Sequence, residues 1–296
     1  MAFRTTWRWM FWSTSIFQAV MILVSFSAFQ ETYAPTILSR RVARLRKDSG
    51  DVRYYTEYER AMAGKSVISI LSQALGRPLR LLAFHPIIQI TSVISAFYYG
   101  ILYIVLASFA DLWVKQYDMS IEMSGLHYIA CALGEIAGSQ LGAPIMDRYY
   151  RRVKALRLHG DPEPEHRIPL TLPGAFVAPL GLFVYGWVAQ YRVQWIVVDI
   201  GVFIASFGMQ IRGIAMQAYV MDAYVEHTSS AMAATQFLRS LTAFLFPLFA
   251  PIMFERIGYG WGNSVLAFAG LVLGLPASLA LWYFGVALRR RMPSSE

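Results

Sequence analysis

Four side chains stand out because they could bind an ion or an organic molecule inside otherwise apolar stretches of the chain. Glu135 lies in an apolar run that is rich in small residues, where a carboxyl group can carry a proton or bind a cation. Three tyrosines, Tyr98, Tyr99 and Tyr103, share a second apolar run. The faces of their rings attract organic cations. Glu135 and these tyrosines predict a path for a small cation or a proton.

A third apolar run contains Gln210 and Arg212 between Gly208 and Gly213. Two glycines so close together would let a helix bend toward a cavity, where Arg212 could pair with Glu135 or with Asp222. Each of these residues also has a purely structural interpretation. Glu135 could be protonated or hydrogen-bonded within a helix bundle, and the tyrosines could be ordinary packing aromatics.

The composition indicates that these apolar runs cross a membrane. The chain has 296 residues, of which 56% are hydrophobic and 15% are charged, whereas a soluble domain is about a quarter charged. The net charge of +8 could suggest a nucleic-acid partner. The basic residues cluster between apolar runs, however, as expected of a protein embedded in a lipid bilayer. We therefore expect an all-α membrane protein and no nucleic-acid partner.

About seven membrane-spanning helices are predicted from the apolar runs. The first apolar run has about twenty residues, which as a helix is long enough to cross the hydrocarbon core of a bilayer. It is longer than the apolar region of a typical signal peptide, so we interpret it as a membrane-spanning helix. The predicted spans are 10–29, 86–110, 124–146, 170–190, 194–218, 230–254 and 263–285.

The charged segments predict four regions and an orientation. Residues 1–29 contain the first span, 30–84 form a long cytoplasmic loop with a helix along the interface, 85–288 form a six-helix bundle, and 289–296 form a tail. Nineteen Lys and Arg residues fall on the side of the long loop and the tail, against five on the other side. By the positive-inside rule, the N-terminus lies outside and the C-terminus in the cytoplasm.

A glycine-rich helix leads directly into a basic segment. Gly134, Gly138 and Gly142 are spaced by four residues, which lets two helix backbones approach closely. The segment that follows is predicted to be a turn at the inner membrane surface. It acts either as a topology signal or, together with Gly138 and Gly142, as a conformational gate with ion pairs that form and break. Its charged residues are Asp147, Arg148, Arg151 and Arg152.

The sequence resembles the major facilitator superfamily of transporters over essentially its whole length. The first span ends in QETYAP at 30–35, which resembles the end of the sixth helix of fungal drug:proton antiporters. FHPIIQ at 84–89 and YYGILY at 98–103 resemble the seventh helix. YVMDAY at 219–224 and FLRS at 237–240 resemble the tenth and eleventh helices of the polyamine and multidrug branch.

The segment DRYYRR at 147–152 resembles the basic turn of that superfamily imperfectly, because Tyr150 replaces the turn glycine. Asp222 and Arg239 flank the short turn after the tenth helix. They are predicted to fix that turn, as an ion pair or as caps.

The resemblance implies the C-terminal portion of an exporter, with helices six to twelve. Its substrates would be cationic drugs or polyamines, exchanged for protons across the plasma membrane. Helices one to five would then belong to a missing N-terminal half of the same fold, and we expect this polypeptide alone not to transport.

A receptor-like or scaffolding membrane protein with seven helices is the alternative interpretation. The 30–84 loop and the lack of a receptor motif argue against it. No catalytic, cofactor or metal-binding pattern is present in the sequence, so we expect neither an enzyme nor a cofactor.

Overall fold

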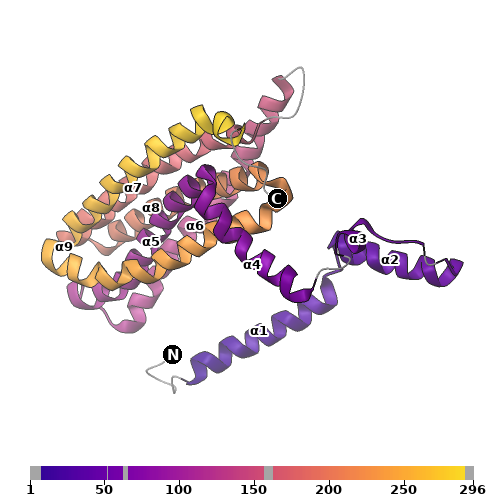
Figure 1. Ribbon diagram of the computed structural model, residues 1–296. Helices are drawn as coiled ribbons and strands as arrows, with labels where there is room; N and C mark the ends of the chain where they lie inside the picture. The colour runs from indigo at the N-terminus through magenta and orange to yellow at the C-terminus, as the bar shows by residue number, and fades with distance from the viewer. Residues whose placement is uncertain (1–7, 52, 63–65, 157–162, 291–296) are drawn as a thin grey trace. The chain divides into compact units, whose positions relative to one another are not determined.

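The computed structural model describes residues 8–51, 53–62, 66–156 and 163–290, and these residues are almost entirely helical (Figure 1). The chain divides into two compact parts, residues 1–73 and 74–296. Among the described residues there is no β-strand. The final predicted tail residues, 291–296, lie outside the described residues.

The first part contains α1 (Arg8–Ala28), α2 (Ala34–Ser49) and α3 (Glu57–Met62). In α1 the hydroxyl groups of Thr14 and Ser25 donate to backbone carbonyls one turn earlier, which satisfies these polar groups inside an apolar helix. Helix α2 has Pro35 in its first turn, where the missing N–H costs nothing.

Most of the segment predicted as a long loop is helical. Gly50 follows the last residue of α2 and caps the helix. Its φ of 68° is a left-handed conformation that glycine adopts without strain. Arg46 joins α2 to α3, because its Nη2 donates to Glu59 Oε2 at 2.9 Å and its Nε to the Tyr54 carbonyl at 2.7 Å. Helix α4 (Val67–Phe84) runs across the boundary between the two parts.

The second part is a bundle of long helices. Its main packing pairs are α5 with α9, α7 with α8, α6 with α8 and α7 with α9. Leu81, near the end of α4, is buried in the core of this bundle with residues of α5, α8 and α9. Its elements are α5 (Pro86–Asp111), η1 (Leu112–Gln116), α6 (Ile121–Leu156), η2 (Pro164–Leu170), α7 (Thr171–Gln190), α8 (Trp195–Ala223), η3 (Val225–His227) and α9 (Thr228–Arg290).

Helix α9 is two helices joined by a kink at Gly258, which has a φ of 75° and a ψ of 170°. Among the described residues, six stretches are long and apolar enough to cross a membrane, and the last of them, Val225–Arg290, contains this kink. The predicted spans 230–254 and 263–285 lie on either side of it. The prediction of an all-α membrane protein is confirmed.

The basic segment after the glycine-rich helix differs from its prediction. Residues 147–152 were predicted to form a turn, but α6 continues as a helix to Leu156. Tyr150, which replaces the glycine expected in a turn, is compatible with this continuation, because tyrosine costs less in a helix than glycine does. The charged residues therefore extend one helix beyond its apolar part.

Candidate functional site

A cavity of about 420 Å³ lies between α5, α6, α8 and α9. Apolar side chains such as Leu102, Leu106 and Met209 form part of its wall. The structure places all of the predicted substrate-path residues in the same wall: Tyr98, Tyr99, Tyr103, Glu135, Gln210 and Arg212. Arg239, which was predicted to fix a turn, lines the cavity as well.

Tyr98 and Arg212 form a buried stack at one side of the cavity. The guanidinium carbon of Arg212 lies 3.8 Å from the centre of the Tyr98 ring, a cation–π geometry. Both residues are almost fully buried, with 3% and 2% of their surfaces exposed. The Tyr98 hydroxyl donates to the Gly270 carbonyl at 2.9 Å, so α5 holds the ring between α8 and α9.

A second stack lies beside the first. The guanidinium carbon of Arg239 is 4.2 Å from the centre of the Tyr99 ring. Tyr103, one turn further along α5, packs against Tyr99 with ring centres 5.1 Å apart. Two of the three predicted tyrosines therefore already carry a cation from the protein itself.

Glu135 has a different environment from the two arginines. It is half-buried in the cavity wall, and it forms no ion pair with any described residue. The predicted alternatives for Arg212, a pair with Glu135 or with Asp222, are likewise absent from the described residues, where Arg212 contacts Tyr98 instead.

Close contacts between helices set the position of Glu135 relative to α8. A Cβ atom at Gly138 would lie 2.8 Å from Gln210 Cβ and 2.9 Å from the Phe207 carbonyl oxygen. At Gly142 the nearest atom would be Ile211 Cγ1, at 3.3 Å. The glycine face of α6 therefore packs on α8. Because both helices contribute to the cavity wall, this packing also sets the width of the cavity.

Arg167 is the centre of an ion-pair cluster at one end of the bundle. Its Nε donates to Asp222 Oδ2 at 2.5 Å, and its Nη1 lies 3.9 Å from Asp147 Oδ1. Its guanidinium carbon also lies 4.5 Å from the centre of the Tyr150 ring. Arg167 belongs to η2, so it links this short element to the ends of α6 and α8.

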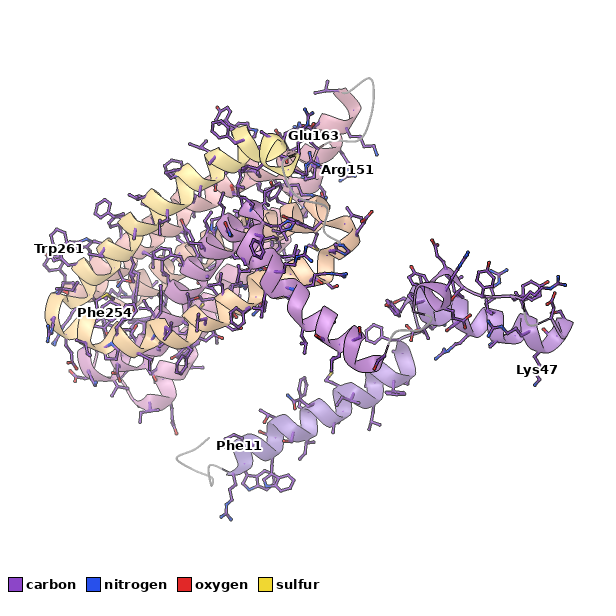
Figure 2. The ribbon with its side chains drawn as sticks, in the orientation of Figure 1. Phe11, Lys47, Arg151, Glu163, Phe254 and Trp261 are labelled. Carbon is purple, nitrogen blue, oxygen red and sulfur yellow. The ribbon has the colours of Figure 1, made fainter. Side chains whose placement is uncertain are left out.

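The predicted gate residues take unequal parts in this cluster. Asp147 pairs with Arg167, whereas Arg148, Arg151 and Arg152 are exposed. Arg151 Nε donates to the backbone carbonyl of Asp147 at 3.3 Å. In Figure 2, Arg151 lies at the opposite end of the bundle from Phe254 and Trp261, which flank the kink in α9.

The predicted partnership of Asp222 with Arg239 is wrong. Asp222 is in the last turn of α8 and binds Arg167, whereas Arg239 is well inside α9 and stacks on Tyr99. Three turns of helix carry Arg239 away from the α8–α9 connection and into the cavity. Asp222 therefore still fixes the end of α8, but through η2.

Comparison with known proteins identifies the family. Residues 1–247 match the sequence profile of the Major Facilitator Superfamily. The chain belongs to the Major Facilitator Superfamily. It is 51% identical over 292 residues to a probable efflux pump, mfs2, of Aspergillus flavus. It is 38% identical over 285 residues both to an uncharacterized transporter of Schizosaccharomyces pombe and to the efflux pump vrtL of Penicillium aethiopicum.

These alignments cover nearly all of this chain but only part of each relative. They include 98%, 96% and 96% of the chain, and 68%, 57% and 56% of the respective relatives. No solved structure matches the chain. Membership of the Major Facilitator Superfamily indicates a multi-pass membrane protein of the transporter class rather than an enzyme, and it does not favour the receptor or scaffold interpretation.

A buried ion pair that sequence analysis missed joins η2 to the end of α9 in this Major Facilitator Superfamily protein. Glu165 is 3% exposed, and Arg289 Nη2 donates to its Oε2 at 3.2 Å. Arg167 was likewise counted only as one basic residue of a loop. A sequence signal was present, since proline and glutamate alternate from Pro162 to Glu165 between two apolar runs.

A second missed contact lies between α6 and α8. His127 Nδ1 is 2.8 Å from Asp199 Oδ2, and the His127 ring stacks on Trp113 with centres 3.7 Å apart. The residues come from three elements, so no local pattern connects them. Within the described residues, no group of three or more His, Cys, Asp or Glu side chains is arranged to hold a metal ion.

Proposed function

We propose that this protein forms part of the substrate path of a proton-coupled exporter of small organic molecules. The observation that carries the proposal is the cavity in which Glu135, Arg212 and Arg239 meet a tyrosine wall. Charged side chains inside membrane-spanning helices are rare, and they usually belong to a substrate or proton path rather than to helix packing alone. Two of the relatives, the probable efflux pump mfs2 and the efflux pump vrtL, support export as the direction of transport.

We further propose that the cavity is one side of the complete binding site. In transporters built from two structural repeats, the substrate lies near the middle of the bilayer between the repeats, and one repeat rocks against the other. The close contact of Gly138 with α8 and the Asp147–Arg167 pair would then belong to the moving half. A second half of the same fold would supply the opposite wall.

Glu135 is the residue we propose as the proton carrier. Because it forms no ion pair with a described residue, it can exchange a proton for a substrate without first breaking an internal contact. The same property favours a second candidate function, the exchange of a cationic drug or polyamine for a proton. In that case the ionised Glu135 would bind the cation directly.

A reconstitution experiment tests transport. The purified protein would be placed in liposomes, alone and together with the part of the Aspergillus flavus relative that it does not match. A pH gradient should drive dye flux only in the combined preparation, and Glu135→Gln should abolish the response to that gradient. Glu122→Gln is the matched control, since Glu122 is an exposed carboxyl in the first turn of the same helix. Equal flux with and without a pH gradient would count against proton coupling.

The orientation is a separate proposal, with the C-terminus in the cytoplasm and the protein in the plasma membrane. Its support is the position of Arg151, in the basic last part of α6, at one end of the bundle, with Phe254 and Trp261 beside the kink of α9 at the other. Membrane-impermeant maleimide should label Arg256→Cys in intact cells, and Arg152→Cys only after permeabilisation. The reverse pattern would invert the orientation.

A further inference from the structure

Arg212 is a buried cation whose hydrogen-bonding groups have no partner in the described residues. It is 2% exposed, and its Nε and Nη1 atoms are buried without an acceptor. Its guanidinium group stacks on the Tyr98 ring. The face of an aromatic ring attracts the positive charge, but it provides no hydrogen-bond acceptor for the N–H groups, which lie in the plane of the guanidinium. A buried N–H group without an acceptor costs free energy. A hydrogen-bond acceptor placed in the cavity beside Arg212 would therefore satisfy donors that no described residue satisfies.

The packing around Arg212 prevents its side chain from extending away from the cavity wall toward the membrane interface. A Cβ atom at Gly174 of α7 would lie 2.8 Å from both the Cβ and the backbone N of Arg212, so α7 presses directly on this point of α8. On the other side, the Tyr98 hydroxyl is held by the Gly270 carbonyl. The guanidinium is thus fixed at the cavity wall rather than extended along the helix toward an interface.

A second arginine adds to the same positive field. Arg239 stacks on Tyr99, and its Nε is also buried without an acceptor among the described residues. The charged residues of the cavity wall are thus two arginines and one glutamate. The carboxylate of Asp222, the other partner predicted for Arg212, is bound to Arg167. Within the described residues, no carboxylate pairs with either arginine of the cavity.

The tyrosine wall is also less suited to a cationic ligand than its sequence suggested. The Tyr98 ring is buried under Arg212, and the Tyr99 ring carries Arg239. A cation that approached these rings would be repelled by the arginines already stacked on them. An anion would meet two guanidinium groups with unused N–H donors, which form strong hydrogen bonds to carboxylates.

We propose that Arg212 is the anchor for an acidic group of the substrate, so that the transported molecules are aromatic or apolar organic acids. The carboxylate or phenolate oxygen accepts hydrogen bonds from the Arg212 guanidinium, with Arg239 nearby, and the apolar body lies along Leu102, Tyr103 and Leu106. This inference rests on the proposed transport function. It replaces the cationic class of substrate with an acidic one.

Three probes of one shape test the charge of the ligand. Binding of 2-naphthoate, 2-naphthylmethanol and 2-naphthylmethylammonium would be measured by calorimetry on the purified protein in a non-ionic detergent, where anionic lipids do not compete. The acid should bind more tightly than the alcohol and the amine. Arg212→Gln should weaken naphthoate binding about 10- to 100-fold, the range expected for losing a hydrogen bond to a charged group.

Two further variants separate a binding role from a structural one. Arg212→Lys should recover only part of the affinity, since lysine keeps the charge but loses the planar fork. Arg256→Gln, at an exposed position of α9, should leave naphthoate affinity unchanged. If Arg212→Gln does not fold, Glu135→Gln decides, because removing the single carboxylate of the wall should strengthen naphthoate binding and weaken amine binding.

The outcomes distinguish this inference from the proposed function. Tighter binding of the amine, or naphthoate binding that is indifferent to both Arg212→Lys and Glu135→Gln, would overturn the acidic anchor while leaving transport of cations in place. The same three probes would be tested for flux in the combined liposomes. If none of them binds or moves, both the acidic anchor and the proposed transport path are wrong.

Discussion

Arg167 and Asp222 are joined by a short hydrogen bond of 2.5 Å that ties η2 to the last turn of α8. The Arg167 side chain is 16% exposed and that of Asp222 is 31% exposed, whereas Asp147, at 3.9 Å from Arg167, is 61% exposed. The same arginine therefore makes one shielded and one solvent-screened ion pair.

The two pairs should differ in their contribution to stability. Asp222→Asn should lower the free energy of unfolding by about 1–3 kcal/mol, the range for a hydrogen bond to a charged group. Asp147→Asn should cost less than about 1 kcal/mol, as expected of an exposed pair. Thermal unfolding of the purified variants checks both values. A larger loss for Asp147→Asn would show that the longer contact is the important one.

Gly174 and Gly138 should be sensitive to the addition of a single methyl group. At Gly174 a Cβ would lie 2.6 Å from the Gly208 carbonyl oxygen, and at Gly138 it would lie 2.9 Å from the Phe207 carbonyl oxygen. Backbone cannot move aside as a flexible side chain can. Each glycine-to-alanine change should therefore destabilise the protein by about 1–3 kcal/mol through overpacking.

Gly125 provides the control for these substitutions. A Cβ there would meet nothing within 4 Å. Gly125 lies in α6, the helix that also contains Gly138, so Gly125→Ala should stabilise α6 by up to about 1 kcal/mol. Denaturation midpoints of the three variants would be compared. Equal behaviour at all three positions would mean that the close helix contacts are absent in the folded protein.

The buried pair of Glu165 and Arg289 should be intolerant of losing one partner. Arg289→Gln leaves the carboxylate of Glu165, which is 3% exposed, without its cation, and the expected loss is about 3–5 kcal/mol. The additional change Glu165→Gln should restore part of that loss. Arg290→Gln is the control, because Arg290 is the exposed neighbour in the same turn. Similar unfolding temperatures for Arg289→Gln and Arg290→Gln would contradict the pairing.

His85 should make stability depend on pH. It is 5% exposed, its Nδ1 lies 3.2 Å from the Tyr224 hydroxyl, and burial followed by the nearby Arg80 charge lowers its pKa. The unfolded chain, with an ordinary pKa of about 6.5, therefore binds more protons below that pH than the folded protein does. This contribution is absent above about pH 7 and destabilises the folded protein increasingly as the pH falls through 6.5.

The matching measurement is thermal unfolding at pH 7.5 and pH 5.5. The unfolding temperature of the natural protein should fall more between these values than that of His85→Gln, which cannot titrate. If both proteins lose the same amount, the proton bound by the unfolded chain comes from another group.

The sequence alone was sufficient to predict an all-α membrane protein, and it picked out six of the residues that line the cavity. Their role in a substrate path stays a prediction. Long apolar runs must be helices in a membrane, because no other local structure satisfies the backbone there. Charged or aromatic residues within those runs, such as Glu135 and Tyr99, are therefore confined to helix faces that meet inside a bundle. The profile of the Major Facilitator Superfamily confirmed the family that the motifs resemble.

The partners of the charged residues were decided by the tertiary structure. Arg239 was predicted to act with Asp222 but stacks on Tyr99 instead. Asp222 pairs with Arg167, which lies in a segment that the sequence indicated only as a basic loop. Helical periodicity determines which residues share a face, but not how far one helix is rotated or shifted against another. Side chains as remote as Tyr98 and Arg212 therefore meet only once glycines such as Gly138 and Gly174 have determined how closely the helices pack.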